Sequence, residues 1–541
     1  MAGTGKRENK EMWLANGLIV DGTGRPGFHG NLLIRNGRIA DITREPVRTE
    51  APAMDCASLV IAPGFIDVHS HMDRVVAFAG FENLKTPFTD QGCTTFIAGN
   101  CGNSAGSLRR SSRFVPRLAL DDITDQAISW DSMAGYFDHL EKIGLTHNLY
   151  TFAGHGSAQV ALRGLSPSPL SEAEMASLLR SLEQDMDQGA GGVSFGLGYE
   201  PGMFFSTEQI KAVARLVKKR GKAITVHGRA YSLLSGAYRE RGGTPHNVLS
   251  MKEMIEVARE TGVRLQYSHL MFAGTKSHPT YIECLEVMDA AIEDGVDVMI
   301  DTYPYHCGFS VINVLMPPWF LSNLPANYHD EQALDRVLRG LSRMPEHGGF
   351  GFNDIQLMHA AHPDYERLGG LFVSQIAEKK GMAPERVVVD ISEKTGGRAR
   401  ILNHNYSNME IIDALIRHPA CLFMTDSVVS QIGVQNPASF GSFPLLLQYA
   451  RDRKLIPLEE AVRKMTGASA ERMGIRDRGR LEKGFAADVT VFDWEKVRDN
   501  NTVTETDQRP TGIEAVFVNG VAMKKEGRVI ETALPGAAIR V

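Results

Sequence analysis

The sequence has little of what marks secreted, membrane or nucleic-acid-binding proteins. Six cysteines are spread over 541 residues, too sparsely for a disulfide framework, which favours a reducing, cytoplasmic setting. No uninterrupted apolar stretch is long enough to cross a bilayer, and the polar N-terminus lacks the apolar core of a secretory signal. The net charge is −6 and no basic run is interleaved with aromatic residues. We therefore expect neither nucleic acid nor a membrane as a partner.

The composition is that of a globular protein large enough for more than one domain. Hydrophobic residues make up 43% and charged residues 23% of the chain. Short strand patterns, with an Asn-Gly turn in each half, occur near both ends, at 13–20 and 31–39 and again at 487–493 and 515–521. Two unrelated hairpins would explain them. A single small β-sandwich domain explains them better, and we predict it at 1–62 plus 475–541.

The middle of the chain alternates strand and helix candidates. Apolar strand candidates end near eight positions: His71, Asn100, His155, Tyr199, His227, His269, Asp301 and Asp426. Most intervals hold an amphipathic helix candidate, such as Glu172–Gln188, Ser206–Arg220, Met251–Thr261 and Tyr281–Asp294. Eight βα repeats predict an α/β fold, a (β/α)₈ TIM barrel over 63–474. The last interval is too long for one crossover helix. It predicts an insertion within about 306–395, lying as a lid over the barrel mouth.

Side chains of metal-binding types stand at the expected carboxyl ends of five of these strands. They are His69 and His71, Cys101, His227, His269 and Asp426. In a strand, residues two apart point to the same face, so the two histidines of the His-x-His pair lie side by side. Each residue also has a structural alternative: a buried small hydrophobe for the cysteine, a core position for a histidine, a helix N-cap for the aspartate. Because a barrel gathers these strand ends at one active site, six such coincidences favour a metal centre.

Mixed thiolate and imidazole ligands favour zinc among the common metals. Zinc lowers the pKa of bound water to about 7 and so makes hydroxide available at neutral pH. Asp426 can accept the proton of the attacking water and deliver it to a leaving nitrogen. We therefore predict Asp426 as the catalytic acid and base.

Several motifs resemble the amidohydrolase superfamily. The Pro-Gly-Phe-Ile-Asp-x-His-x-His-x-Asp segment at 63–73 is shared across the superfamily. Other motifs are similar to the N-acyl-D-amino-acid deacylase (D-aminoacylase) branch: Asn100-Cys101-Gly102, Gly154-His155-Gly156, Tyr199-Glu200-Pro201-Gly202, Ser268-His269, Tyr303-Pro304-Tyr305 and Pro317-Pro318-Trp319. The resemblance covers nearly the whole chain, from about Trp13 to the last strands.

The resemblance implies a tightly held zinc on Cys101, His227 and His269. It implies a second, weaker metal position between His69, His71 and Asp426, which Cys101 could bridge. Many superfamily members bridge two metals with a carbamylated lysine at the end of strand four, but the segment 191–199 contains no lysine. That absence speaks against a hydantoinase or dihydroorotase type of site.

The resemblance also implies residues on the substrate side. Tyr199 resembles the tyrosine that contacts the substrate near the scissile amide. His155 resembles a residue behind the ligands or beside the substrate, and a structural role is equally open. Where similar deacylases carry cations that hold the substrate carboxylate, this chain has Leu270 and Met271, and later Ala438. A carboxylate that enters a barrel mouth needs a paired donor.

Two other cations, Arg229 and Lys276, are the candidates to replace the missing ones. Without such a replacement, the substrate would be an amide that lacks a free α-carboxylate or carries its carboxylate at a different place.

The sequence therefore predicts a zinc-dependent amidohydrolase that cleaves a non-peptide C–N bond in a small-molecule amide. An N-acyl amino acid or a related N-acyl amide is the expected substrate. One alternative is a cyclic-amide hydrolase or a deaminase on the same fold. Another is a non-catalytic scaffold, which would be expected to have lost ligands, whereas all six positions are filled here. The substrate's stereochemistry, the number of working metals and the oligomeric state stay open at this stage.

Overall fold

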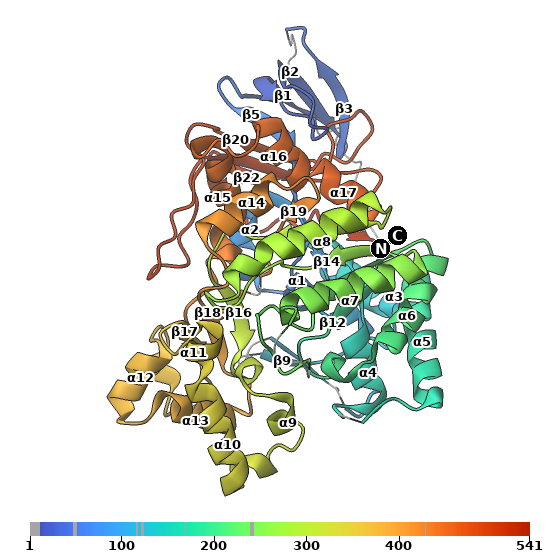
Figure 1. The fold of residues 1–541 in the computed structure, drawn as a ribbon. Helices are drawn as coiled ribbons and strands as arrows, with labels where there is room; N and C mark the ends of the chain where they lie inside the picture. Colours follow the sequence, from blue (N-terminus) through green and yellow to red (C-terminus); the bar gives the residue numbers. More distant parts are fainter. Residues whose placement is uncertain are drawn as a thin grey trace.

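A barrel of parallel strands occupies the middle of the chain (Figure 1). The structure is a computed structural model that describes residues 11–46, 51–114, 117–120, 124–166, 168–238, 243–427 and 429–541. The polar N-terminus and residues 47–50 of the predicted β-domain lie outside the described residues. Within these ranges, no helix is long and apolar enough to cross a membrane.

The barrel strands follow one another in chain order. They are β6 (Phe65–Asp67), β7 (Cys93–Ala98), β10 (Asn148–Thr151) with its continuation β11 (Ala153–Gly154), β12 (Gly192–Gly196), β13 (Ala223–His227), β14 (Arg264–Tyr267), β15 (Val298–Thr302) and β19 (Cys421–Phe423). Hydrogen bonds join them into two parallel runs, from β6 to β10 and from β11 to β19. Just past the strand ends, Ser70 and Ser427 form a parallel bridge, and the Asp426 N–H donates to the His69 carbonyl at 2.9 Å. These contacts close the ring, and the TIM barrel prediction is confirmed.

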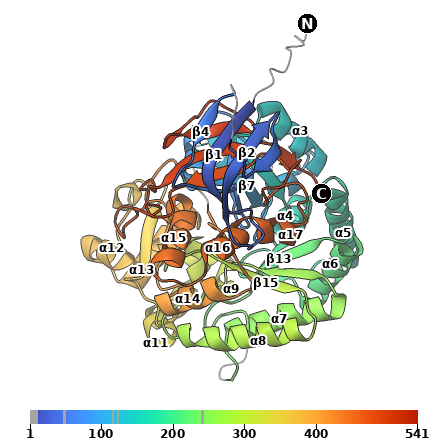
Figure 2. The same cartoon turned by 90° about the horizontal axis from the view of Figure 1, so that it is seen from above.

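Helices cover the outside of the barrel (Figure 2). They include α5 (Glu172–Asp187), α6 (Thr207–Lys219), α7 (His246–Thr261) and α8 (Tyr281–Glu293), close to the predicted bounds. Both α5 and α6 start with a capping box, in which Ser171 pairs with Glu174 and Ser206 with Gln209. The start of α7 is five residues earlier than predicted, because polar residues such as Asn247 and Ser250 are buried there and hide the apolar pattern.

Both ends of the chain build one β-domain. Its strands are β1 (Glu11–Ile19), β2 (Phe28–Arg35), β3 (Arg38–Thr43), β4 (Ala53–Asp55), β5 (Val60–Pro63), β20 (Val489–Phe492), β21 (Ile513–Val518), β22 (Val521–Lys525) and β23 (Arg528–Val529). The two halves meet where β5 pairs antiparallel with β20. Asn36 and Asn519 adopt positive φ angles at the predicted Asn-Gly turns. The last strand, β24 (Ala538–Ile539), instead pairs with β10 of the barrel.

Between β15 and β19 the chain forms a separate body with its own core. An antiparallel sheet consists of β16 (Gly308–Val311), β18 (Arg400–Asn403) and β17 (Ile355–His359). Helices α10 (Glu331–Ser342), α12 (Val373–Lys380) and α13 (Pro384–Thr395) pack with it around a buried core that includes Ile312, Val388 and Ile401. Figure 1 shows this body, drawn in yellow, beside the barrel. The chain then returns to the barrel through α14 (Met409–Arg417).

Candidate metal centre

The six side chains predicted as metal ligands meet at the carboxyl ends of the barrel strands. His69 and His71 follow β6, Cys101 follows β7, His227 ends β13, His269 follows β14 and Asp426 follows β19. They form two groups that share Cys101, one with His69, His71 and Asp426 and one with His227 and His269. Within each group, the candidate ligand atoms all lie within 4.8 Å of one another. His71, His227 and Asp426 are partly exposed and the other three are buried, so the cluster is open on one side.

The distances between ligand atoms fit metal ions. Cys101 Sγ lies 3.3 Å from His69 Nε2, 3.4 Å from His269 Nε2 and 3.8 Å from His227 Nδ1. His69 Nε2 and His71 Nε2 lie 3.3 and 3.5 Å from the same Asp426 oxygen. Zinc bonds of about 2.0–2.3 Å place two ligand atoms of a tetrahedral ion roughly 3.3–3.6 Å apart. The distance between His227 Nδ1 and His269 Nε2 is shorter, at 2.9 Å. The other distances match this spacing, and each group has room for one ion.

Three of the six residues have a backbone conformation that side chains rarely adopt. The φ angles are +54° at Cys101, +35° at His269 and +50° at Asp426, all in the left-handed region. Hydrogen bonds from neighbouring strands hold two of them there: the Asp426 N–H donates to the His69 carbonyl, and the His269 N–H donates to the Asp301 carboxylate at 2.6 Å. Such over-determined strain is found mainly at functional sites.

Two buried carboxylates support the cluster from inside the barrel. Asp301 also accepts a hydrogen bond from Gln266 Nε2 at 2.7 Å, and its Oδ1 lies 3.7 Å from His69 Nδ1. Asp67 accepts from the Thr425 N–H and hydroxyl, at 2.9 and 2.6 Å, and so fixes the residue before Asp426. Burial raises the pKa of both carboxyls to about 7. Sequence reasoning missed these supports; the only signal was an acidic residue in an otherwise apolar strand.

Burial also sets the protonation of the ligand groups. It raises the pKa of the Cys101 thiol well above its usual value and lowers the pKa of His69, His227 and His269. Burial opposes ionisation of Asp426, but the surrounding imidazoles of His269, His69 and His71 outweigh it and hold the pKa of this carboxyl below its ordinary value. At neutral pH the cluster therefore holds a protonated thiol, neutral buried imidazoles and an Asp426 carboxylate whose ionised form is favoured by the hydrogen bond from His71.

Two predicted substrate-side residues lie beside or behind the shared ligand. The Tyr199 hydroxyl donates to the Cys101 carbonyl at 2.6 Å, and its ring centroid is 4.8 Å from that of His227. His155 is buried behind the loop after β7, with Nδ1 3.2 Å from the Ser194 carbonyl and its ring 4.8 Å from Phe195. Burial lowers the pKa of His155 to about 4, so its imidazole is neutral.

Leu270 and Met271 stand where similar deacylases carry cations, and Arg229 and Lys276 are the predicted replacement cations. All four side chains contact other groups of the protein. Leu270 is buried, and the Met271 sulfur lies 4.0 Å from the Tyr303 hydroxyl. The Arg229 guanidinium forms a 3.0 Å ion pair with Glu253 and also donates to two main-chain carbonyls. The Lys276 ammonium donates to the Glu346 carbonyl. Both substitutes thus already have partners, and the structure offers neither as an unpaired cation for a substrate.

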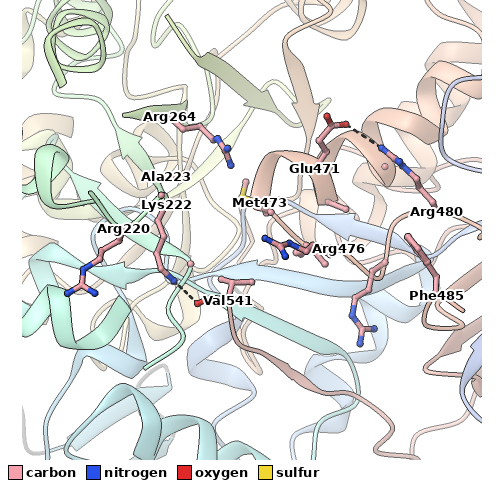
Figure 3. A pocket seen from close by; sticks show the side chains of 17 residues that line it. Arg220, Lys222, Ala223, Arg264, Glu471, Met473, Arg476, Arg480, Phe485 and Val541 are labelled. Atoms are coloured by element: carbon pink, nitrogen blue, oxygen red, sulfur yellow. Dashed lines mark hydrogen bonds and ion pairs between the residues drawn. The ribbon is translucent and has the colours of Figure 1, made fainter. Parts of the chain in front are cut away.

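A cavity of about 600 Å³ lies elsewhere, at the opposite ends of β13 and β14 (Figure 3). The cations in its lining are Arg220, Lys222, Arg264, Arg476, Arg478 and Arg480. Most are already neutralised: Arg264 pairs with Asp297, and Arg220 with Glu183 and Asp187. Its described lining includes none of the predicted site residues, so we place the chemistry at the ligand cluster and not in this cavity.

Comparisons with known proteins agree with the fold. A model of the amidohydrolase family matches residues 374–523. D-aminoacylase from Alcaligenes xylosoxydans xylosoxydans is 28% identical, over 95% of each chain. The zinc complex of N-acyl-D-glutamate deacylase from Bordetella bronchiseptica, with a phosphonate that mimics the tetrahedral intermediate, superposes with a TM-score of 0.80. It is 26% identical and covers 99% of this chain and 100% of its own.

A solved D-aminoacylase with a binuclear metal centre gives a TM-score of 0.81, at 26% identity and the same coverage. That enzyme is activated by one metal and attenuated by the second. The full-length likeness, together with two ligand groups sharing one cysteine, leads to one assignment. This chain is a D-aminoacylase-like, metal-dependent amidohydrolase, similar over nearly its whole length to D-aminoacylase and the N-acyl-D-amino-acid deacylases.

Proposed function

We propose that this protein is a zinc-dependent deacylase that hydrolyses the amide bond of an N-acyl amino acid or a closely related N-acyl amide. The observation that carries the proposal is the position of Cys101 between two groups of ligand atoms, with Asp426 at the open side. The relatives support it, because one is named a D-aminoacylase and another was solved with zinc.

In this proposal Cys101, His227 and His269 hold the tight zinc. His69, His71 and Asp426 form the second, weaker position, with the Cys101 sulfur within reach of both. The donor set suits zinc, since thiolate and imidazole are its usual ligands. When bound, zinc supplies Lewis acidity toward a carbonyl oxygen and makes water a better nucleophile at neutral pH.

Asp426 acts as the general base and then as the general acid. Its carboxylate is kept ionised by the surrounding imidazoles, so it is ready to accept the proton of an attacking water. It is partly exposed at the open side of the cluster, where a substrate amide has access to it. The same carboxyl then donates that proton to the leaving nitrogen, which must depart as a neutral amine.

Tyr199 holds a hydrogen-bond donor next to the reacting groups. Burial raises the pKa of its phenol well above the usual value, so the hydroxyl keeps its proton at neutral pH. In this structure the Tyr199 hydroxyl donates a hydrogen bond to the Cys101 carbonyl. Turned toward a substrate, the same donor would stabilise the oxygen that becomes negative as the amide is attacked.

The alternatives are less well supported. Strand β12 and the segment after it have no lysine that could bridge two metals, which disfavours a hydantoinase-like cyclic-amide hydrolase. A scaffold without catalysis would not need Asp301 and Asp67 to position groups for an open, partly exposed cluster.

Metal analysis and a hydrolysis screen test the proposal. We expect zinc in the purified protein and hydrolysis of N-acetyl amino acids of one configuration. Asp426→Asn should retain the tight zinc and lose about 100- to 10,000-fold in kcat, the usual contribution of a general base. Asp185→Asn is the control, since Asp185 is a buried carboxylate that bonds Ser107 and Arg109 away from the cluster. A zinc-loaded protein that hydrolyses no N-acyl amide, or an Asp426→Asn variant as active as the parent, would contradict the proposal.

A further inference from the structure

The peptide group between Cys101 and Gly102 is held on both sides by hydrogen bonds. Its N–H donates to the Ser194 hydroxyl of β12 at 3.0 Å. Its carbonyl oxygen accepts two hydrogen bonds, from the Tyr199 hydroxyl at 2.6 Å and from the Asn103 side-chain nitrogen Nδ2 at 3.1 Å. Since a carbonyl oxygen has two lone pairs, these two donors satisfy it fully.

The surroundings keep this carbonyl in place. Cys101 is buried, and its φ angle of +54° is followed by +72° at Gly102. A Cβ at Gly196 would overlap the Cys101 oxygen and lie 2.7 Å from the Tyr199 hydroxyl oxygen, so the carbonyl faces β12 and not the solvent. Because Ser194 fixes the N–H of the same planar peptide, the carbonyl cannot turn without breaking that hydrogen bond. Water therefore does not replace a donor that this oxygen loses.

Tyr199 has one hydrogen to donate and two acceptors that need it. In the proposed reaction its hydroxyl stabilises the oxygen of the attacked amide, and for that it must leave the Cys101 carbonyl. A buried carbonyl that loses its last donor costs free energy, whereas one that keeps a donor costs little. Asn103 supplies the remaining donor. It is partly exposed, and its own N–H donates to the Asn100 carbonyl at 2.9 Å, so a tight turn holds it in place independently of Tyr199.

We propose that Asn103 is a positioning residue that frees the Tyr199 hydroxyl for the substrate. With Asn103 in place, the Cys101 carbonyl keeps a donor when the Tyr199 hydroxyl turns to the oxygen that becomes negative. Without Asn103, Tyr199 would be the only donor to that carbonyl among the residues that the structure describes, and it would be held there. This inference rests on the proposed deacylase function and adds a residue that acts through Tyr199.

A double-mutant cycle tests whether Asn103 acts through Tyr199. We would measure kcat/KM of the zinc-loaded enzyme for the N-acetyl amino acid that the parent hydrolyses fastest. Asn103→Leu should lower kcat/KM about 5- to 100-fold, which is the equivalent of leaving a buried carbonyl without a donor. In Tyr199→Phe, which has no hydroxyl to free, the added Asn103→Leu should change kcat/KM less than about threefold. A residue that only holds the Cys101 loop would lower kcat/KM at least as much in Tyr199→Phe, because the carbonyl then loses both donors.

Two binding measurements separate this role from a structural one. The affinity for a phosphonate analogue of the N-acetyl substrate should fall by the same factor in Asn103→Leu, because a phosphonate oxygen takes the place of the oxygen that becomes negative. Zinc affinity in chelator competition should stay within about threefold of the parent. Asn500→Leu is the matched control: Asn500 is partly exposed, lies between β20 and β21, and donates through Nδ2 to the Arg509 carbonyl at 2.8 Å.

Thermal unfolding verifies that each variant is folded. Asn103→Asp has the same shape but no donor, and it should act in the same direction if the leucine variant does not fold. An unchanged kcat/KM in Asn103→Leu, a loss of zinc affinity, or an equal loss of kcat/KM in the Tyr199→Phe background would overturn the inference, while hydrolysis by the parent leaves the deacylase function intact. If the zinc-loaded parent hydrolyses no N-acyl amide, the proposed function fails, and this inference fails with it.

Discussion

Zinc binding to the metal-free protein should release about one proton per tight site, and that proton should come from Cys101. The number follows from the protonation of each ligand before binding. Burial keeps the Cys101 thiol protonated, whereas a metal ligand must be a thiolate. Burial also keeps His227 and His269 neutral, so these two have no proton to lose. The predicted sum is therefore about one proton, not three.

Calorimetry at pH 6 in buffers of different ionisation enthalpy measures this number directly. At that pH a water with a pKa of about 7 on zinc adds little to the count. Cys101→Ser should bind zinc more weakly and release close to no proton, because an alcohol stays protonated. His147→Asn is a control, because His147 is buried elsewhere in the barrel and bonds Thr89 and Thr146. Release of two or more protons would show that the imidazoles are charged before binding and would refute the reasoning.

Three further outcomes follow from the same contacts. His71→Asn should leave the tight zinc in place and remove the second zinc, because His71 belongs only to the group with His69 and Asp426. Zinc analysis after dialysis checks this, and loss of both ions would contradict the assignment. Asp301→Asn should weaken zinc binding about 10- to 100-fold in chelator competition, since Asp301 supports His269 and His69; an unchanged affinity would reduce Asp301 to a packing role. Burial lowers the pKa of His147 from 6.5 to about 3. As the pH falls through 6.5, this imidazole therefore takes up a proton in the unfolded chain but not in the folded protein. That linkage should cost about 2 kcal/mol of unfolding free energy between pH 7 and pH 5, and urea unfolding of His147→Asn should show a flatter pH dependence.

The positions of the metal ligands could be predicted from the sequence, whereas the residues that support them could not. The ligands stand at the ends of apolar runs, and a barrel brings such ends together whatever the details of packing. Asp67 and Asp301 lie inside strands, and their partners Thr425 and His269 come from other strands. These contacts arise only when the strands pair, so no local sequence pattern predicts them.

Recognition of the substrate carboxylate shows the same limit. From the sequence, Arg229 and Lys276 were reasonable replacements for the missing cations. The structure gives Arg229 a carboxylate partner 24 residues further on, and it joins Lys276 to a main-chain carbonyl of the insertion.

By itself, the sequence determined the barrel, the β-domain built from both termini and the residue types of a zinc centre. These follow from the period of apolar residues, from turn residues and from the chemistry of side chains at strand ends, all of which are local properties. Only the tertiary structure decided which carboxylates support the ligands and which cations are already engaged by other groups of the protein. Those outcomes depend on contacts between segments far apart in the chain, where charges and hydrogen bonds compete for partners that no local pattern specifies.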